Sequence, residues 1–337
     1  MPAYIKDISY TIPSFVVTND DLVKEFPTWN VDKITEKIGI SERHVVTQDE
    51  TALDLAIEAA ESLFMNNVAK KEEIDFVIYC TQSPDYKLPS SACIIQDKLG
   101  LSTRCGAFDY NLGCSGYVYG LAIAKGFVES GVASNVLLLT GETYTKYIHP
   151  KDKGNRSIFG DGASATVVSN DGFAEIGNFV LGTDGSGADS LIVKTGGSRY
   201  PVSRNDLTFT DKGTPVSSDH LQMDGQEIFA FTLIRVPKML KEVLRVNKIE
   251  KEDVDLFVFH QANKYMLDNL QRKLKIENDR FFVDYEKVGN TVSSTIPIAL
   301  CDARKKGVLK GNVMLAGFGV GLSWAAVNLK VNRFFVI

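Results

Sequence analysis

Cys114 is the residue of this sequence best suited to act as a nucleophile. It lies between Gly113 and Ser115 in the segment DYNLGCSGYVYG, and apolar residues at helical spacing follow it. A thiol at the start of a helix feels the positive end of the peptide dipoles, which favours the thiolate. The neighbouring glycines leave backbone amide groups accessible. The alternative is a small buried cysteine in a tight turn from strand to helix, and this segment by itself favours that structural role.

A histidine and an asparagine could assist such a nucleophile. His260 ends the apolar run 257–259 and leads into a loop, where active-site groups often lie. Asn290 follows Gly289 and precedes a run of serines and threonines. Each also has an ordinary structural interpretation. A histidine at a strand end often makes a structural hydrogen bond, and Gly-Asn is a common turn pair whose following Ser/Thr run could cap the next helix.

A glycine-rich segment could supply hydrogen-bond donors. It reads GFGVG over residues 317–321 and follows the apolar run 313–316. Such a loop after a strand can bring backbone N–H groups toward a ligand oxygen. Because glycine-rich loops are common, this segment is weak support for a site when it is taken alone.

Apolar runs and helical patterns alternate along the chain. Strands covered on both faces are expected at 76–80, 135–139, 256–259 and 313–316. Helices are expected at 51–64, 231–246 and 264–274, the first capped by Thr51. This alternation predicts an α/β layered protein. The segments 71–78 and 251–258 are alike, each an acidic stretch leading into a strand, which indicates either two similar halves facing across a cleft or a coincidence.

The composition excludes several classes of protein. The 337 residues are 44% hydrophobic and 23% charged, as in an ordinary globular protein. A net charge of −5 argues against nucleic-acid binding. No apolar stretch approaches the roughly 20 residues that cross a bilayer, and no signal peptide is visible. The five cysteines form no CxxC pair, which favours a reducing cytoplasm over a disulfide framework or a metal site.

In combination, these motifs resemble β-ketoacyl-acyl-carrier-protein synthase III. The resemblance runs from end to end, and it is carried by GISERH (39–44), PSSAC (89–93), GCSG (113–116), FGDGA (159–163), MDGQEIF (223–229), HQAN (260–263), GNT (289–291) and the glycine loop near Trp324. It implies a thiolase-like α/β fold in which two related halves, 1–172 and 173–337, form a five-layer α-β-α-β-α sandwich. It also implies a cytoplasmic homodimer that uses a CoA thioester as substrate and needs no cofactor or metal.

The resemblance assigns roles to the three candidate residues. Cys114 would be the nucleophile that takes an acyl group from acyl-CoA, and His260 with Asn290 would complete a triad. A malonyl thioester on acyl carrier protein would then lose carbon dioxide, and its enolate oxygen would be stabilised by His260 Nε2 and Asn290 Nδ2. The backbone N–H groups of Cys114 and Val320 would hold the oxyanion formed at the acyl carbonyl.

The resemblance also implies a set of substrate-binding residues: Lys37, Leu88, Lys153, Phe229, Asn263, Lys264 and Phe318. Leu88 occupies a position that is often aromatic in relatives, where it bounds the acyl pocket of the dimer partner. Val320 occupies a position that is often glycine, so its side chain is expected to narrow the pocket. Acyl groups of a different length or shape are therefore plausible substrates.

Other differences from the family concern the acyl donor. Lys37 and Lys153 replace arginines that relatives use for the CoA nucleotide. The tryptophan that stacks on adenine is absent from its expected place, although Trp29 lies a few residues earlier and could substitute. Tyr265 replaces an arginine that often meets the carrier protein, and Lys264 could compensate. The donor is accordingly either an acyl-CoA or an acyl carrier protein.

Three other functions fit parts of the pattern. Cysteine, histidine and asparagine in this order also occur in papain-like proteases, but Tyr117 and Val118 follow the cysteine where those enzymes carry a tryptophan. An acyltransferase of the same fold could move the acyl group from Cys114 to an amine or hydroxyl without decarboxylation. A non-catalytic partner subunit is disfavoured because Cys114, His260 and Asn290 are all present.

Overall fold

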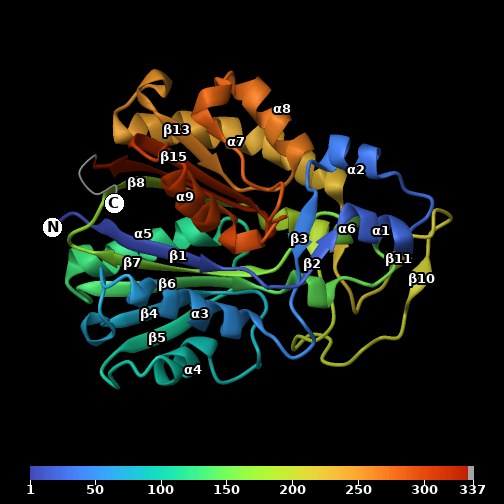
Figure 1. Ribbon diagram of the computed structural model, residues 1–337, viewed down its shortest axis with the longest axis horizontal. Coiled ribbons are helices and arrows are strands. Elements are labelled where there is room, and N and C mark those ends of the chain that lie inside the picture. The colour runs from blue at the N-terminus through green and yellow to red at the C-terminus, as the bar shows by residue number, and fades with distance from the viewer. Residues whose placement is uncertain (333–337) are drawn as a thin grey trace.

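Two sets of five strands, joined edge to edge, form the centre of the fold (Figure 1). The computed structural model describes residues 1–332, the side chains of residues 33 and 34 excepted. The strand order is β5-β4-β6-β7-β1 in one set and β14-β13-β15-β16-β8 in the other, and the sets meet where Ile5 of β1 lies opposite Ala174 of β8. The strands are β1 (Tyr4–Thr11), β4 (Phe76–Cys80), β5 (Gly106–Tyr110), β6 (Asn135–Glu142), β7 (Gly162–Ser169), β8 (Ala174–Thr183), β13 (Leu256–Phe259), β14 (Phe281–Phe282), β15 (Gly311–Gly319) and β16 (Ser323–Val331).

The two sets repeat one pairing pattern. β4 is parallel to β5 and β6, and β13 is parallel to β14 and β15. Antiparallel partners complete each set, β7 and β1 in the first and β16 and β8 in the second. The two similar sequence segments occupy equivalent places, since a 3₁₀ turn precedes both β4 and β13. We propose residues 1–172 and 173–337 as the two related halves; this boundary falls in the turn between β7 and β8.

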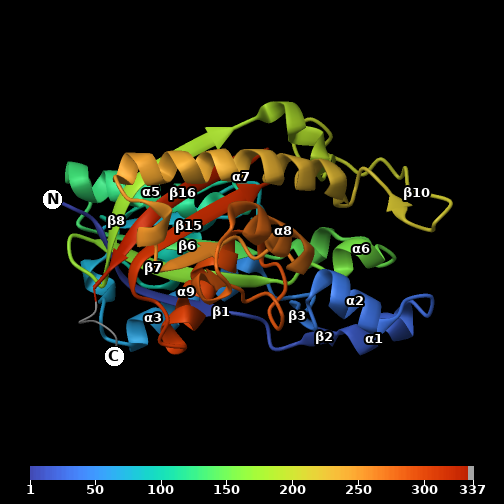
Figure 2. The same ribbon diagram turned by 90° about the horizontal axis from the view of Figure 1, so that it is seen from above.

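Helices form three layers around these strands. The outer layers are α3 (Ala52–Met65) with α4 (Ser91–Lys98) on one side and α7 (Gly225–Asn247) with α8 (Lys264–Leu274) on the other. α5 (Gly116–Ser130) and α9 (Thr295–Lys305) lie between the two sets of strands. Figure 2 shows α7 lying along the outer face of β8 and β16. The predicted five-layer α-β-α-β-α arrangement is confirmed.

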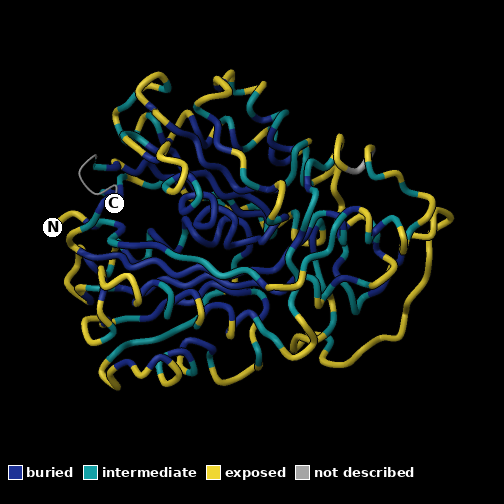
Figure 3. The backbone as a smooth tube through the Cα atoms, in the orientation of Figure 1, coloured by how far each residue is buried: buried dark blue, intermediate teal, exposed yellow. Residues whose placement is uncertain are grey.

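Each helix layer has its own apolar core, visible as the buried interior in Figure 3. The central core packs Tyr117 and Leu121 of α5 and Ile296 of α9 against residues of both strand sets, including Ile78 and Leu315. Burying a side chain of this size contributes about 1.5–3 kcal/mol of transfer free energy. The central helices are consequently fixed from both sides, and the residues at their N-terminal ends have defined positions.

The predicted elements are present with small changes at their ends. β4, β13 and α8 have the predicted bounds, and β6 and β15 extend beyond theirs. Thr51 caps α3 as predicted, since its hydroxyl accepts from the backbone N–H of Asp54 and that carboxylate accepts from the backbone N–H of Thr51. α7 begins at Gly225, six residues before the predicted start at 231, because Asp224 caps it by accepting from the N–H groups of Gln226 and Glu227.

Smaller elements gather at the end of the molecule that carries α1, α2 and β10 in Figure 1. They are β2 (Val16–Thr18), α1 (Asn19–Glu25), α2 (Val31–Ile38), β3 (Glu42–His44), α6 (Lys153–Arg156), β9 (Leu191–Ile192), β10 (Thr208–Phe209), β11 (Pro215–Val216) and β12 (Gln222–Met223). β12 pairs with β9, so the segment between them, which contains β10 and β11, begins and ends at the same place in the fold. These elements surround the larger cavity described below.

Candidate active site

Cys114 lies in the turn between β5 and α5, two residues before the helix begins. The turn is closed by a hydrogen bond from the N–H of Gly116 to the carbonyl of Gly113, 2.7 Å long. Ser115 is tied to the other half of the molecule, because its hydroxyl lies 2.6 Å from that of Ser323 on β16. The thiol is almost fully buried, with 6% of the residue exposed.

The glycine loop at the end of β15 packs directly on Cys114. A Cβ atom on Gly317 would lie 2.7 Å from the Cys114 carbonyl oxygen, and one on Gly319 would lie 2.9 Å from Cys114 Sγ. Only glycine allows this approach. The backbone N–H groups of Cys114 and Val320 both stabilise the thiolate form of the sulfur and lower the thiol pKa. Two amide donors therefore converge at the sulfur, as an oxyanion site next to it requires.

A methyl group at Gly319 should disturb this arrangement. In Gly319→Ala the new Cβ must displace either the sulfur or the Val320 amide, and a misplacement of about 1 Å costs on the order of 10²-fold in rate. We expect acyl loading of Cys114, followed by intact mass, to slow by about that factor. Gly185→Ala is the matched control, since no atom lies within 4 Å of its added Cβ. Equal loading rates in the two variants would contradict the close approach.

The expectation of a lowered thiol pKa is wrong for this structure. Burial is the main cause and the carboxyl of Glu142 the second, and together they raise the pKa of Cys114 to about 12. The amide groups of Cys114 and Val320 oppose this rise without cancelling it. Sequence reasoning took account of the helix start but could not see how deeply the sulfur is buried. A pKa raised this far favours the protonated thiol at neutral pH.

This protonation state predicts a pH dependence for alkylation of the free enzyme. With a pKa of about 12, the thiolate fraction rises tenfold for each pH unit throughout the range from about 7 to 9. The rate at which iodoacetamide modifies Cys114, measured by peptide mass, should rise in proportion and show no plateau. A Cys114→Ala sample corrects for reaction at the exposed Cys93. A plateau near pH 8 would show that the thiol is activated before substrate binds.

His260 follows β13 and is buried, with 2% of the residue exposed. Its backbone N–H donates to the carbonyl of Ala316 at 2.8 Å, which places it beside the glycine loop, and its ring lies 5.7 Å from that of Phe318 at a nearly perpendicular angle. Burial lowers the pKa of His260 to about 3. The imidazole is therefore neutral at physiological pH, and one of its nitrogens carries the proton.

Thr295, the first residue of α9, controls which nitrogen that is. Its Oγ1 lies 2.7 Å from His260 Nδ1 and 3.1 Å from the carbonyl oxygen of Val292. If the hydroxyl donates to Val292, Nδ1–H donates to Thr295 and Nε2 carries a lone pair. If the hydroxyl donates to Nδ1, Nε2 carries the proton and becomes a donor. Rotation of the Thr295 hydroxyl thus decides whether His260 Nε2 accepts a proton or donates a hydrogen bond.

Substitution of Thr295 tests this positioning role. Thr295→Val keeps the shape of the side chain but removes a hydrogen bond worth about 1.5 kcal/mol, so we expect a roughly tenfold loss of decarboxylation rate. Thr295→Ser keeps the hydroxyl and should restore the rate to within about threefold. The measurement is carbon dioxide release from a malonyl thioester by the acylated enzyme. A serine variant as slow as the valine variant would show that packing, not the hydroxyl, is what matters.

Asn290 is held by a constrained turn. Its Oδ1 accepts from the backbone N–H of Val292 at 2.9 Å, which leaves the two N–H groups of Nδ2 as its donors. Val292 has a φ of +56°, a region that costs a β-branched residue of order 1–3 kcal/mol. The side chain of Val292 packs with Cys114 and Tyr144 in one apolar cluster. This strained turn brings the Asn290 segment from the second half against the cysteine of the first.

The Ser/Thr run after Asn290 does not cap α9 through its side chains. Ser293 Oγ donates to Glu142 at 3.0 Å, and Ser294 Oγ lies 2.8 Å from Thr140 Oγ1. Glu142 also accepts from the backbone N–H of Gln82 and from the hydroxyl of Ser83. Burial raises the pKa of Glu142 to about 8, and these hydrogen bonds oppose the rise. Ser293 and Ser294 of the second half are therefore hydrogen-bonded to Glu142 and Thr140 of the first half. The sequence did not indicate this role.

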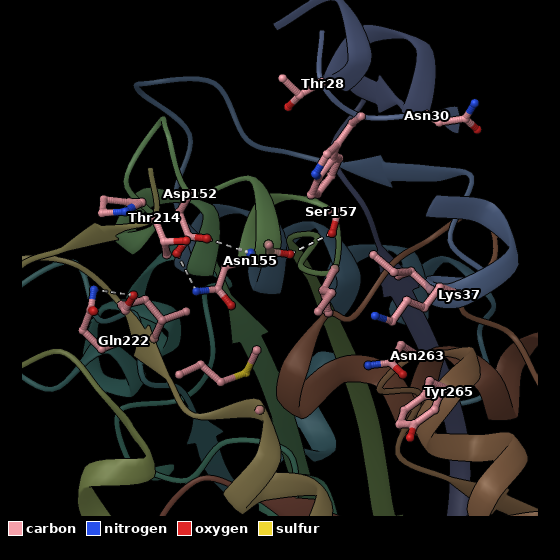
Figure 4. A pocket seen from close by; sticks show the side chains of 18 residues that line it. Thr28, Asn30, Lys37, Asp152, Asn155, Ser157, Thr214, Gln222, Asn263 and Tyr265 are labelled. Atoms are coloured by element: carbon pink, nitrogen blue, oxygen red, sulfur yellow. Dashed lines mark hydrogen bonds between the residues drawn. The ribbon is translucent and has the colours of Figure 1, made fainter. Parts of the chain in front are cut away.

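A cavity of about 790 Å³ opens at the end of the molecule near α2 and α6. Figure 4 shows Lys37, Asn263 and Tyr265 on one side of it and Asp152 and Gln222 on the other. Asn263 also caps α8, since its Oδ1 accepts from the N–H of Met266. Leu221 lines this cavity and also a second one of about 600 Å³ that borders Val320.

Trp29 lies at the larger cavity, and Lys153 lies next to its ring. Trp29 lines the wall, and Lys153 Nζ lies 5.7 Å from the centre of the indole ring. Trp29 is therefore close to Lys153, as its suggested role in place of the missing tryptophan requires.

The other predicted substrate-binding residues are spread more widely. Phe318 lies against His260, while Phe229 stacks on Tyr265 with ring centres 4.9 Å apart. Lys264 pairs with Asp268 at 2.5 Å within α8 and does not line either of the two cavities. Leu88 is 82% exposed in a surface loop and also lines neither. Within one chain Leu88 therefore lies away from both cavities, whereas Lys264 directly follows Asn263, which lines the larger cavity.

Comparisons with known proteins place this chain in a family. Residues 108–185 match the model described as 3-oxoacyl-[acyl-carrier-protein] synthase III, and residues 244–331 match the model of its C-terminal part. The β-ketoacyl-[acyl-carrier-protein] synthase III of Caldanaerobacter subterraneus subsp. tengcongensis is 38% identical over 326 residues, 96% of each chain. The chain belongs to the β-ketoacyl-acyl-carrier-protein synthase III family.

Solved structures agree with the synthase III assignment. A 2.1 Å crystal structure of 3-oxoacyl-(acyl-carrier-protein) synthase III is 49% identical, with a TM-score of 0.95 over 98% of this chain and 100% of the other. The 3-oxoacyl-(acyl-carrier protein) synthase from Burkholderia xenovorans LB400 is 35% identical, with a TM-score of 0.89 over 98% and 95% of the chains. This synthase III family member is thus an acyltransferase of the condensing type, and the protease hypothesis is excluded.

The described residues contain neither a membrane-spanning helix nor a cluster of metal ligands. Within residues 1–332, no helix has the length and apolar character needed to cross a membrane. In the same residues, no group of three or more His, Cys, Asp or Glu side chains is arranged to hold a metal ion.

Proposed function

We propose that Cys114 is acylated and that the acyl group is then joined to a malonyl thioester with loss of carbon dioxide. The observation that carries this proposal is the close packing of the glycine loop on the Cys114 sulfur, where a Cβ on Gly319 would lie 2.9 Å from Sγ. The amide groups of Cys114 and Val320 lower the thiol pKa there, and His260 is hydrogen-bonded to Ala316 of the same strand as Gly319. In the first step the sulfur attacks the acyl carbonyl, the two amides stabilise the oxyanion, and the CoA thiolate leaves. The proton of the Cys114 thiol passes to the leaving sulfur, and His260 Nε2, in its lone-pair form, would carry it.

The second step would use the donor form of the same histidine. When a malonyl thioester loses carbon dioxide, the electron pair moves to the thioester carbonyl and charge develops on its oxygen. Asn290 Oδ1 accepts from Val292, so the carboxamide can offer the N–H groups of Nδ2 to this oxygen. His260 Nε2–H is the second donor when Thr295 donates to Nδ1. The enolate carbon then attacks the acyl carbonyl and releases the Cys114 sulfur, which takes up a proton.

The larger cavity supports acyl-CoA as the donor. A nucleotide needs a flat apolar surface for its base and cations for its phosphates. Trp29 and Lys153 could supply both, with Lys37 at the edge of the same cavity. Asn263 would bind the pantetheine arm of the CoA. Phe318 would contact the part of this arm near His260, and Phe229 would contact the part near Tyr265. A malonyl group on an acyl carrier protein would enter the same way, with Lys264 and Tyr265 meeting the carrier.

Exposed side chains near the smaller cavity support a homodimer. Leu88 and Tyr86 are 82% and 60% exposed, and Tyr86 lines the cavity that borders Val320. Large exposed apolar side chains grouped on one loop are typical of an interface. The dimer would place Leu88 against the acyl pocket of its partner. The five free cysteines support a reducing, cytoplasmic location, and the proposed reaction needs no cofactor.

Intact-mass measurement tests this function. The protein is incubated with acyl-CoA and acyl-carrier-protein donors, and a malonyl thioester is then added. We expect an acyl increment on Cys114 that disappears as carbon dioxide and a 3-oxoacyl product form. Loss of the increment to an amine or hydroxyl acceptor, without carbon dioxide release, would instead support the acyltransferase of the same fold.

A further inference from the structure

The smaller cavity leads away from Val320 and has a mixed lining. It measures about 600 Å³, and apolar walls come from Leu191, Ile192 and Val193. The polar side chains of Gln82, Asn111, Tyr144 and Tyr147 also line it. Because Val320 is a proposed oxyanion residue, this cavity is the space into which an acyl group on Cys114 would extend. Its polar lining bears on which acyl groups fit.

The polar side chains form one hydrogen-bonded cluster, centred on Gln82. Gln82 Nε2 donates to Asn111 Oδ1 at 2.7 Å, and the Tyr144 hydroxyl donates to Gln82 Oε1. The Tyr147 hydroxyl donates to the Gln82 carbonyl oxygen at 3.1 Å. The backbone N–H of Gln82 donates to the buried Glu142, which fixes the base of this residue. We call Gln82, Asn111 and Tyr144 the glutamine cluster.

Gln82 and Tyr144 of the glutamine cluster lie close to the sulfur, while Asn111 is exposed. A Cβ on Gly113, the residue before Cys114, would lie 2.7 Å from Gln82 Oε1 and 2.5 Å from Val320 Cγ1. Tyr144 packs in the same apolar cluster as Cys114 and is 4% exposed. The carboxamide and the phenol therefore flank the first few atoms of any acyl chain on Cys114.

The glutamine cluster keeps unused hydrogen-bonding capacity. Gln82 Nε2 has two N–H groups, and among residues 1–332 only the one to Asn111 has a partner. The Tyr144 oxygen donates to Gln82 and can still accept. An alkyl chain would separate these groups from water and leave them unpaired, which is costly. A site built to hydrogen-bond a substrate group discriminates against an analogue that lacks it.

We propose that the glutamine cluster makes this enzyme prefer short acyl groups that carry a hydroxyl near the thioester over plain alkyl acyl groups of the same length. The hydroxyl would accept from Gln82 Nε2 and donate to the Tyr144 oxygen. This inference rests on the proposed acylation of Cys114 and adds the class of acyl group. The competing explanation is that Gln82 and Tyr144 only shorten the cavity, which would favour small acyl groups whether or not they are polar.

Matched pairs of acyl-CoA donors separate the two explanations. The rate of acyl mass gain on Cys114 is measured with butyryl-CoA against 3-hydroxybutyryl-CoA, and with propionyl-CoA against lactoyl-CoA. We expect the hydroxylated member of at least one pair to react about tenfold faster or more. A ratio below three in both pairs would overturn the proposal. No acyl mass with any CoA or carrier-protein donor would instead refute the proposed function itself.

Variants of the glutamine cluster link the preference to its cause. Gln82→Leu and the isosteric Tyr144→Phe should each reduce the ratio of hydroxyacyl to plain acyl loading at least threefold. Gln48→Leu, at an exposed glutamine outside both cavities, is the matched control and should keep the wild-type ratio. Thermal unfolding of each variant shows whether it is folded. An unchanged ratio in the folded Tyr144→Phe variant would contradict the assignment to the glutamine cluster.

Discussion

Cys114→Ala should abolish acylation of the protein and reduce product formation by about 10⁴-fold or more, the effect typical of removing a nucleophile. The other four cysteines cannot substitute. Cys80 is buried beside the Cys114 turn, but its thiol donates to the carbonyl of Leu112 at 3.1 Å, and burial raises its pKa. Cys301 is buried on α9, Cys93 is exposed on α4, and Cys105 precedes β5. One backbone hydrogen bond lowers the thiol pKa at Cys80 and at Cys105, whereas two do so at Cys114. The measurement is intact mass after incubation with acyl-CoA donors.

A serine at the same position should be as inactive as alanine. Burial that raises the pKa of the Cys114 thiol to about 12 would hold a hydroxyl still more firmly in its protonated form. Cys93→Ala removes a thiol from the surface and serves as the control, which should load at the wild-type rate. An acyl increment that persists on Cys114→Ala would show that another residue is the nucleophile.

His260→Ala and Asn290→Ala should each slow decarboxylation by about 10²–10³-fold, the loss expected for one donor to a developing oxyanion. In the proposed mechanism both side chains donate to the enolate oxygen, so neither would fully replace the other. The amide donors of Cys114 and Val320 remain in both variants, so some acyl loading should persist. His260→Ala should also slow loading to a degree, because the thiol is protonated and His260 would help to move its proton.

The two steps are separated by measuring both on one sample. Acyl mass on Cys114 reports loading, and carbon dioxide release from a malonyl thioester reports decarboxylation. Asn178→Ala, which removes an exposed carboxamide from β8, is the control for Asn290 and should change neither. Carbon dioxide release at the wild-type rate by either active-site variant would show that its role is wrongly assigned.

Much of the fold could be predicted because its signals are local. The strands β4 and β13 and the helix α8 have regular apolar patterns and clear ends, and the sequence predicts their bounds. The start of α7 was missed because its cap, Asp224, is followed by a glycine and by polar residues before the apolar stripe begins. The similar segments 71–78 and 251–258 suggest two related halves, and the matching parallel pairing of β4 and β13 is consistent with this division.

The site was predicted less completely because several of its properties are not local. That Cys114, His260 and the Asn290 turn share common neighbours followed from a resemblance of motifs, and the structure shows the contacts. The pKa of Cys114 depends on burial by the glycine loop and on Glu142, which is far away in sequence. Thr295 belongs to the Ser/Thr run after Asn290, which the sequence suggests as a helix cap, so its contact with His260 could not be predicted. Gln82 and Tyr144 had no motif, and only the cavity reveals them.

A single-turnover experiment tests the central claim most directly. Enzyme acylated on Cys114 is freed of donor and mixed with a malonyl thioester labelled in its carboxyl group. We predict that labelled carbon dioxide, loss of the acyl increment and formation of a 3-oxoacyl thioester appear together in equal amounts. Loss of the acyl group with the label retained in the malonyl thioester would contradict a shared site for the sulfur, the imidazole and the carboxamide.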